Sequence, residues 1–181
     1  MPYGKTAVGL GTQILGSDGR GVGTKKAQEL IDGYFEAYPG MQDLFEHWRN
    51  HARKHGFVRT LLGRTRPLPG AVATDWTANA DLRRAVNTSV QGSAADIVTT
   101  AMLRCNTIRL ADGRWFNSKL ASLGVRLCMQ VHDELIFEVP DQHANTACRV
   151  IKETMESPFR VPLKVQLKVD AEIGDNWGAA K

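Results

Sequence analysis

The sequence lacks the features that mark several large classes of protein. No apolar run approaches the ~18 residues of a membrane-spanning helix, so neither an integral membrane protein nor a membrane partner is expected. No apolar signal core follows the first residues, so secretion is not expected. The three cysteines are widely spaced and form no Cys-x-x-Cys pair, so neither a disulfide framework nor a zinc site is indicated. We therefore expect a soluble protein of the cytoplasm.

Acidic residues are also missing from one long stretch, residues 47–74. The whole chain has 23 Lys and Arg against 19 Asp and Glu, a formal charge of +4. The acid-free stretch holds these cations: Arg49, Arg53, Lys54, Arg59, Arg64 and Arg66. The rest of the chain is therefore slightly acidic. Such a stretch fits either a surface that binds phosphate groups or an ordinary solvated helix face, and the charge pattern leaves both open.

Three histidines within this stretch, His47, His51 and His55, recur every four residues and share one face of a helix. Two histidines at this spacing can hold a metal ion. No carboxylate or cysteine lies close by in the sequence to complete such a site. We therefore interpret the histidines as an exposed polar stripe.

The 181 residues are 43% hydrophobic and 23% charged, which suits one globular domain or two lobes that share a core. Apolar periodicity and Gly or Pro stops predict helices at 5–15, 24–38 and 41–55, with Thr24 as a helix cap. A small hairpin is predicted from segments 57–62 and 65–68, on either side of Gly63-Arg64.

The second half of the chain predicts a long helix and then strands. Residues 75–79 offer caps for a helix that continues to about Leu110, with an interruption or a tight packing contact at residues 92–95. Alternating apolar residues predict strands at 125–131, 135–139 and 161–171, and a helix is expected at 141–156. Helices precede a helix-backed antiparallel hairpin, so the fold class is α+β.

The long helix carries a polar stripe, because Arg83, Asn87 and Gln91 are spaced by four residues. Amide and guanidinium groups suit the minor groove of a duplex, where every base pair offers an acceptor at a similar position. An exposed polar face without a ligand explains the same spacing, and the spacing alone does not separate the two.

The two strands around residue 133 meet at an acidic turn, His132-Asp133-Glu134. Asp is common in turns for conformational reasons alone. Carboxylates at a rigid strand end are also the ligands that Mg²⁺ requires, and two such ions can promote phosphoryl transfer. Nucleotidyl transfer and metal-dependent hydrolysis both remain open at this point.

Taken together, these motifs resemble the C-terminal part of a family A DNA polymerase, the DNA polymerase I type, nearly end to end. Residues 129–135, Met-Gln-Val-His-Asp-Glu-Leu, are similar to the palm motif of the family, and residues 83–97 to its primer-template helix. Residues 56–66 resemble the connection from fingers to palm, Gly174-Asp175-Asn176-Trp177 the C-terminal ending, and Tyr3-Gly4 the end of the fingers motif.

The resemblance implies a role for each matched residue. Asp133 would bind the catalytic Mg²⁺ ions, with Glu134 beside it, and His132 would lie near the primer terminus. The polar stripe Arg83, Asn87 and Gln91 would contact the minor groove of primer-template DNA. Tyr3 would stack against the template base, and Gly4 would allow close approach there. Deoxynucleoside triphosphates would be the substrates, in DNA replication or repair.

The resemblance also implies an organisation. Residues 1–74 would form the C-terminal part of the fingers and the connection to the palm, and residues 75–181 the C-terminal part of the palm. No counterpart of the second metal-binding Asp, or of the fingers Lys and Arg that hold the triphosphate, is found here. We therefore expect activity only together with an N-terminal polymerase portion, in cis or in trans, in a bacterial or phage-infected cell or an organelle.

Two other functions remain as alternatives. The first is a DNA-binding module or remnant that binds primer-template DNA without catalysis. The second is a metal-dependent phosphohydrolase built on the acidic turn, although no second carboxylate cluster or nucleophile is visible in the sequence.

Overall fold

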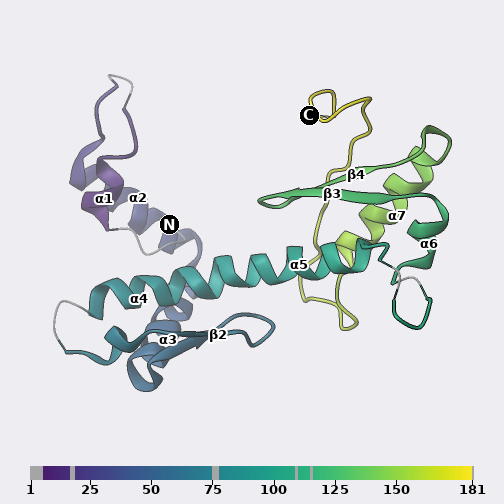
Figure 1. Cartoon of the computed structure of the whole chain (residues 1–181). Helices are drawn as coiled ribbons and strands as arrows, with labels where there is room; N and C mark the ends of the chain where they lie inside the picture. The colour runs from purple at the N-terminus through teal and green to yellow at the C-terminus, as the bar shows by residue number, and fades with distance from the viewer. Residues whose placement is uncertain (1–5, 17–18, 75–77, 109, 115, 181) are drawn as a thin grey trace. The chain divides into compact units, whose positions relative to one another are not determined.

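A computed structural model describes residues 6–16, 19–74, 78–108, 110–114 and 116–180 (Figure 1). The described elements mix helices with two small antiparallel sheets, which confirms the α+β class. The chain divides into two compact units, residues 1–94 and 95–181. The boundary at residue 74 was predicted from the family's fingers and palm, not from how compactly the chain folds. The division into compact units does not test it, and it stays a prediction. Among the described residues no helix is both long and apolar enough to cross a membrane.

Three helices open the first unit: α1 (Ala7–Gly11), α2 (Gly23–Ala37) and α3 (Pro39–His55). Thr6 caps α1, because its Oγ1 accepts a hydrogen bond from the Gly9 amide at 3.3 Å. The predicted cap Thr24 is wrong: α2 begins one residue earlier, Val22 holds the cap position, and no side chain caps it. The end of α3 matches its prediction, since Gly56 closes it at φ 70°, a left-handed conformation that favours glycine.

The predicted small hairpin is confirmed, with shorter strands: β1 (Phe57–Arg59) pairs with β2 (Thr65–Pro67) in antiparallel register. A 3-10 turn, η1 (Pro69–Val72), follows. One buried apolar cluster joins α3, the hairpin, η1 and the next helix; its members are Ala52, Val58, Leu68, Ala71, Ala78, Leu82 and Ala85. This cluster fixes the hairpin and the polar-stripe helix in one unit.

The predicted long helix is three consecutive segments: α4 (Ala78–Asn87), the π-helical turn η2 (Thr88–Gly92) and α5 (Ser93–Cys105). The expected interruption is therefore real and lies a few residues earlier than predicted. The predicted end at Leu110 is wrong. The helix ends at Cys105 because the Asn106 side chain accepts a hydrogen bond from the Ile108 amide (3.0 Å), a local turn that competes with the helix.

The second unit contains α6 (Ser118–Ser122), β3 (Arg126–Val131), β4 (Glu134–Glu138), a 3-10 turn η3 (Asp141–His143) and α7 (Ala144–Glu156). Strands β3 and β4 form an antiparallel hairpin with an irregularity between Leu127 and Met129. The core of the second unit consists of Cys105, Leu120, Val125, Ala147, Val150 and Ile151. Burial raises the pKa of the Cys105 thiol to about 11.

The strand predicted at residues 161–171 is wrong, since this segment has no regular structure. Both sheets of the described residues have only two strands, and neither pairs with the segment. Pro162 has no N–H to donate, and the Val169 amide donates to a side chain instead, Oε1 of Glu156 at 3.2 Å. Val161 and Val165 are 77% and 69% exposed. An alternating apolar pattern specifies a strand only where a neighbouring strand is available.

Candidate functional site

The polar stripe of the first unit lies on α4 and η2. Leu82 and Val86 of the same helix are buried. Arg83 and Gln91 are exposed, and Asn87, the last residue of α4, is half-buried. The guanidinium of Arg83 and the amide of Gln91 are therefore accessible to solvent, whereas the amide of Asn87 is partly buried.

Asn87 is unusual because its Oδ1 atom is buried and has no hydrogen-bond partner among the described residues. A buried polar atom without a partner costs about 1–3 kcal/mol. Folding alone does not favour an amide at this position. The arrangement is compatible with a ligand that supplies the missing hydrogen bond.

Asp81 anchors the start of this helix and was not identified from the sequence. It is 7% exposed, and its carboxylate accepts hydrogen bonds from the Gly70 amide at 2.9 Å and the Arg84 guanidinium at 2.6 Å. The contact with Gly70 ties η1 to α4, and the contact with Arg84 lies within α4. A single acid in a helical polar pattern gives no sequence signal that distinguishes such a buried anchor from an exposed residue.

The acidic turn of the second unit is tighter than predicted. Glu134 is already in β4, paired with Val131, so His132 and Asp133 alone form the loop. His132 has φ 54°, the only positive φ among the described non-glycine residues. A positive φ at the first loop position is typical of a II′ hairpin, where glycine is favoured. Gln130 Nε2 donates to the His132 carbonyl at 3.1 Å and supports the turn.

The turn presents its polar groups to solvent, since His132, Asp133 and Glu134 are all exposed. Asp133 and Glu134 are the type of ligand that Mg²⁺ binds. Among the residues that the structure describes, no three His, Cys, Asp or Glu side chains gather closely enough to hold a metal ion. This donor set does not fit a complete two-ion centre.

The basic stretch makes many contacts within its own unit. Arg53 and Arg49 pair with Glu46 at 2.7 and 3.3 Å, and hydrogen bonding to Arg53 holds the pKa of Glu46 below its usual value. The Arg59 guanidinium lies 5.3 Å from the centre of the Phe57 ring. Several cations that a phosphate-binding surface would use here therefore already make contacts within the folded unit.

The histidine stripe is partly packed. The rings of His51 and His55 have centroids 4.6 Å apart, and His51 also meets Phe57 edge-on at 5.2 Å. Burial, and then the charges of its cationic neighbours, lower the pKa of His51. No third metal ligand joins these rings among the described residues.

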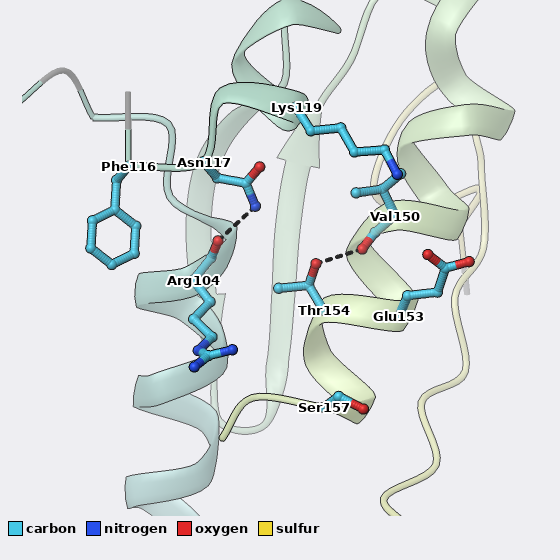
Figure 2. A pocket seen from close by; sticks show the side chains of 8 residues that line it. All are labelled: Arg104, Phe116, Asn117, Lys119, Val150, Glu153, Thr154 and Ser157. Carbon is cyan, nitrogen blue, oxygen red and sulfur yellow. Dashed lines mark hydrogen bonds between the residues drawn. The ribbon is translucent and has the colours of Figure 1, made fainter. Parts of the chain in front are cut away.

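Tyr3 and Gly4, the predicted contacts to the template base, lie outside the described residues. The second unit also has an open pocket of about 520 Å³ that contains none of the predicted site residues (Figure 2). It is lined by the end of α5, the start of α6 and one face of α7, including Arg104, Lys119 and Glu153. Asn117 Nδ2 donates to the Arg104 carbonyl (2.8 Å) at its wall.

Comparison with known proteins gives a consistent family assignment. The model of the family described as DNA polymerase family A matches residues 1–179. The chain is 38% identical over 180 residues to DNA polymerase I of Bacillus caldotenax, covering 99% of this chain and 19% of the relative. It is 40% identical over 183 residues to the chloroplastic/mitochondrial DNA polymerase I A of Arabidopsis thaliana, covering all of this chain and 16% of the relative.

A solved structure resembles nearly the whole chain. It is the polymerase domain of Pol1 from M. smegmatis, in complex with a DNA primer-template and a dNTP. The likeness has a TM-score of 0.82 at 34% identity and covers 98% of this chain and 29% of that one. The chain thus spans about a fifth of the length of the curated relatives it matches.

Proposed function

The chain belongs to DNA polymerase family A, and from that premise we propose that it is the C-terminal portion of the fingers and palm of a DNA-directed DNA polymerase. The observation that carries this proposal is the fold similarity over 98% of the chain to a polymerase domain in complex with a primer-template and a dNTP. Primer-template DNA and deoxynucleoside triphosphates are the proposed ligands, in replication or repair. We place the boundary between fingers connection and palm at residue 74.

The stripe Arg83, Asn87 and Gln91 is proposed to contact the minor groove of the duplex near the primer end. Its support is the exposure of Arg83 and Gln91 and the unpaired Oδ1 of Asn87. His132 is proposed to lie at the primer terminus, and Tyr3 and Gly4 at the template base.

Asp133 and Glu134 are proposed as the carboxylates that this chain contributes to Mg²⁺ binding. When bound, the metal would activate the primer hydroxyl and stabilise the leaving pyrophosphate. Because the described residues do not hold a full set of ligands, nucleotidyl transfer is proposed to need an N-terminal polymerase portion. We accordingly propose negligible extension by these 181 residues alone, and a bacterial, phage-infected or organellar setting.

Equilibrium binding tests the DNA-binding part of the proposal. We expect the chain to bind a fluorescent primer-template in the presence of Mg²⁺, more weakly as salt increases. Arg83→Ala should weaken binding, whereas Arg114→Ala, which removes an exposed guanidinium of the second unit, should have little effect. Absence of binding by the folded wild-type chain at low salt would contradict the proposal.

The alternative of a DNA-binding module without catalysis is favoured by one observation, the absence of a metal-binding cluster among the described residues. Under this alternative, Asp133→Asn leaves every property of the chain unchanged, including its behaviour with an N-terminal polymerase portion. Loss of extension in that mixture on this single substitution would exclude the alternative.

A further inference from the structure

The β1–β2 hairpin lies directly against the π-helical turn η2 that follows Asn87, within the first unit. Three hydrogen bonds join the hairpin to η2 and the first residue of α5. They are Leu61 N to Ser93 Oγ at 2.9 Å, an Arg64 guanidinium N to the Gly92 carbonyl at 3.1 Å, and an Arg66 guanidinium N to Thr88 Oγ1 at 2.9 Å. The contacts reach both ends of the turn.

The hairpin is itself held in a fixed shape. The Thr60 amide donates to the Arg64 carbonyl at 3.0 Å, and Thr60 Oγ1 accepts from the Arg64 amide at 3.2 Å. Gly63 supplies the left-handed conformation at the tip, with φ 82°. Thr60 is 7% exposed. The donors that meet η2 therefore come from a preorganised loop.

Two side chains, one from the hairpin and one from α5, donate to backbone carbonyls of the π turn. A π turn shifts the helix hydrogen bonds from i+4 to i+5, and side-chain donors add to the backbone pairing there. The Ser89 carbonyl accepts from Ser93 Oγ at 2.6 Å, and the Gly92 carbonyl accepts from Arg64. Ser93 links the two elements, since the same Oγ accepts from the Leu61 amide.

The two elements also approach too closely for a larger residue. A Cβ atom at Gly92 would lie 2.7 Å from Cγ2 of Thr60, closer than carbon atoms pack. Because Thr60 is buried and branched at Cβ, it has little freedom to move away. A side chain at residue 92 would separate the hairpin from the turn.

The position of the turn gives these contacts a consequence for DNA binding. Asn87 directly precedes η2, and Gln91 lies within it. A π turn accommodates one extra residue, and one residue rotates the following helix by about 100°. The turn therefore sets which way Gln91 faces relative to Arg83 and Asn87.

We propose that the β1–β2 hairpin is a clamp on η2, and that Arg64 and Arg66 are positioning residues that hold Gln91 in phase with the rest of the minor-groove stripe. The proposal rests on the proposed function, because it names what aligns the DNA-contacting residues. It accounts for two cations of the acid-free stretch by a role other than phosphate binding.

Charge-neutral variants of the 181-residue chain test the clamp and leave Arg64 and Arg66 in place. Gly92→Ala forces the elements apart, and Thr88→Val removes the acceptor for Arg66. Gly33→Ala is the matched glycine control, since nothing lies within 4 Å of a Cβ built there. Thr88→Ser is the conservative control, since it keeps the hydroxyl.

The readout compares the affinities for two primer-templates that differ at one position near the primer end. One carries adenine there, and the other carries 3-deazaadenine, a base that lacks the minor-groove acceptor N3. We expect the wild type, Gly33→Ala and Thr88→Ser to prefer adenine about fivefold, the effect of one hydrogen bond. Gly92→Ala and Thr88→Val should bind both duplexes equally, with circular dichroism showing a folded chain. A preference equal to that of the wild type in both variants would overturn the clamp.

Amide hydrogen exchange of residues 88–93, measured without DNA, separates the clamp from the proposed function. If the wild-type chain shows no preference for adenine, the minor-groove role of the stripe fails. The clamp then stands only if Gly92→Ala and Thr88→Val accelerate exchange at least tenfold while both controls do not. Unchanged exchange in both variants would overturn it.

Discussion

Two of the residues proposed to contact DNA, one in each unit, occupy positions that folding alone disfavours. His132 takes a backbone conformation that favours glycine, and Asn87 buries an amide oxygen without a partner. Local rules of this kind are broken most often at functional sites. Motif and spacing point to both side chains in the sequence, and the structure adds an independent physical reason to test them.

His132→Gly should leave the hairpin intact. Relief of the left-handed strain, about 1–2 kcal/mol, is partly offset by the extra entropy of an unfolded glycine, about 0.5–1 kcal/mol. We therefore expect the free energy of unfolding in urea to stay the same or rise by up to about 1.5 kcal/mol, while affinity for a primer-template falls. A clear loss of stability would show that the imidazole serves the fold.

Asn87→Ala should likewise separate stability from binding. Alanine removes the unpaired oxygen and has the higher helix propensity, so we expect an increase of up to about 1 kcal/mol in the free energy of unfolding. Primer-template affinity should fall. Val86→Ala, a buried position on the same helix, serves as the control and should destabilise the chain. A destabilised Asn87→Ala chain with normal affinity would contradict the assignment.

At the scale of elements, the sequence predicts structure well where the signal is local. Gly56 and Gly63 mark the end of α3 and the tip of the first hairpin, and both adopt the left-handed conformation that glycine favours. The sequence indicates the π turn only as an interruption, because the β1–β2 hairpin residues that contact it lie 22 to 32 residues away in the sequence. Residues 161–171 have the pattern of a strand and no partner to form it with. The buried anchor Asp81 was invisible for the same reason, since its partner is on another element.

The α3 helix should make stability depend on pH through His51. Because burial and neighbouring cations lower its pKa in the folded state, the unfolded chain takes up the proton more readily. The stabilisation is complete above the unfolded value, about 6.5, and decreases as the pH falls below it. We expect the urea midpoint to drop between pH 7 and 5.5, and His51→Gln to reduce that drop. An equal drop in His51→Gln and wild type would contradict this.

At the scale of the whole molecule, the chain has a formal charge of +4, and the cations of its acid-free stretch have different partners. Arg49 and Arg53 pair with Glu46, and Arg64 and Arg66 meet η2. The matched relatives are about five times longer than this chain, and among the described residues no three His, Cys, Asp or Glu side chains gather closely enough to hold a metal ion. The proposal that nucleotidyl transfer needs a further polymerase portion is consistent with both observations.

Primer extension by a reconstituted mixture tests the central claim most directly. The chain would be combined with the separately expressed N-terminal part of the polymerase domain of Bacillus caldotenax DNA polymerase I, ending where the similarity begins, together with Mg²⁺, dNTPs and a labelled primer-template. We predict template-directed extension by the mixture, none by either part alone, and at least a 100-fold loss with Asp133→Asn. No extension by a folded mixture that binds DNA, or equal extension with Asp133→Asn, would contradict the account.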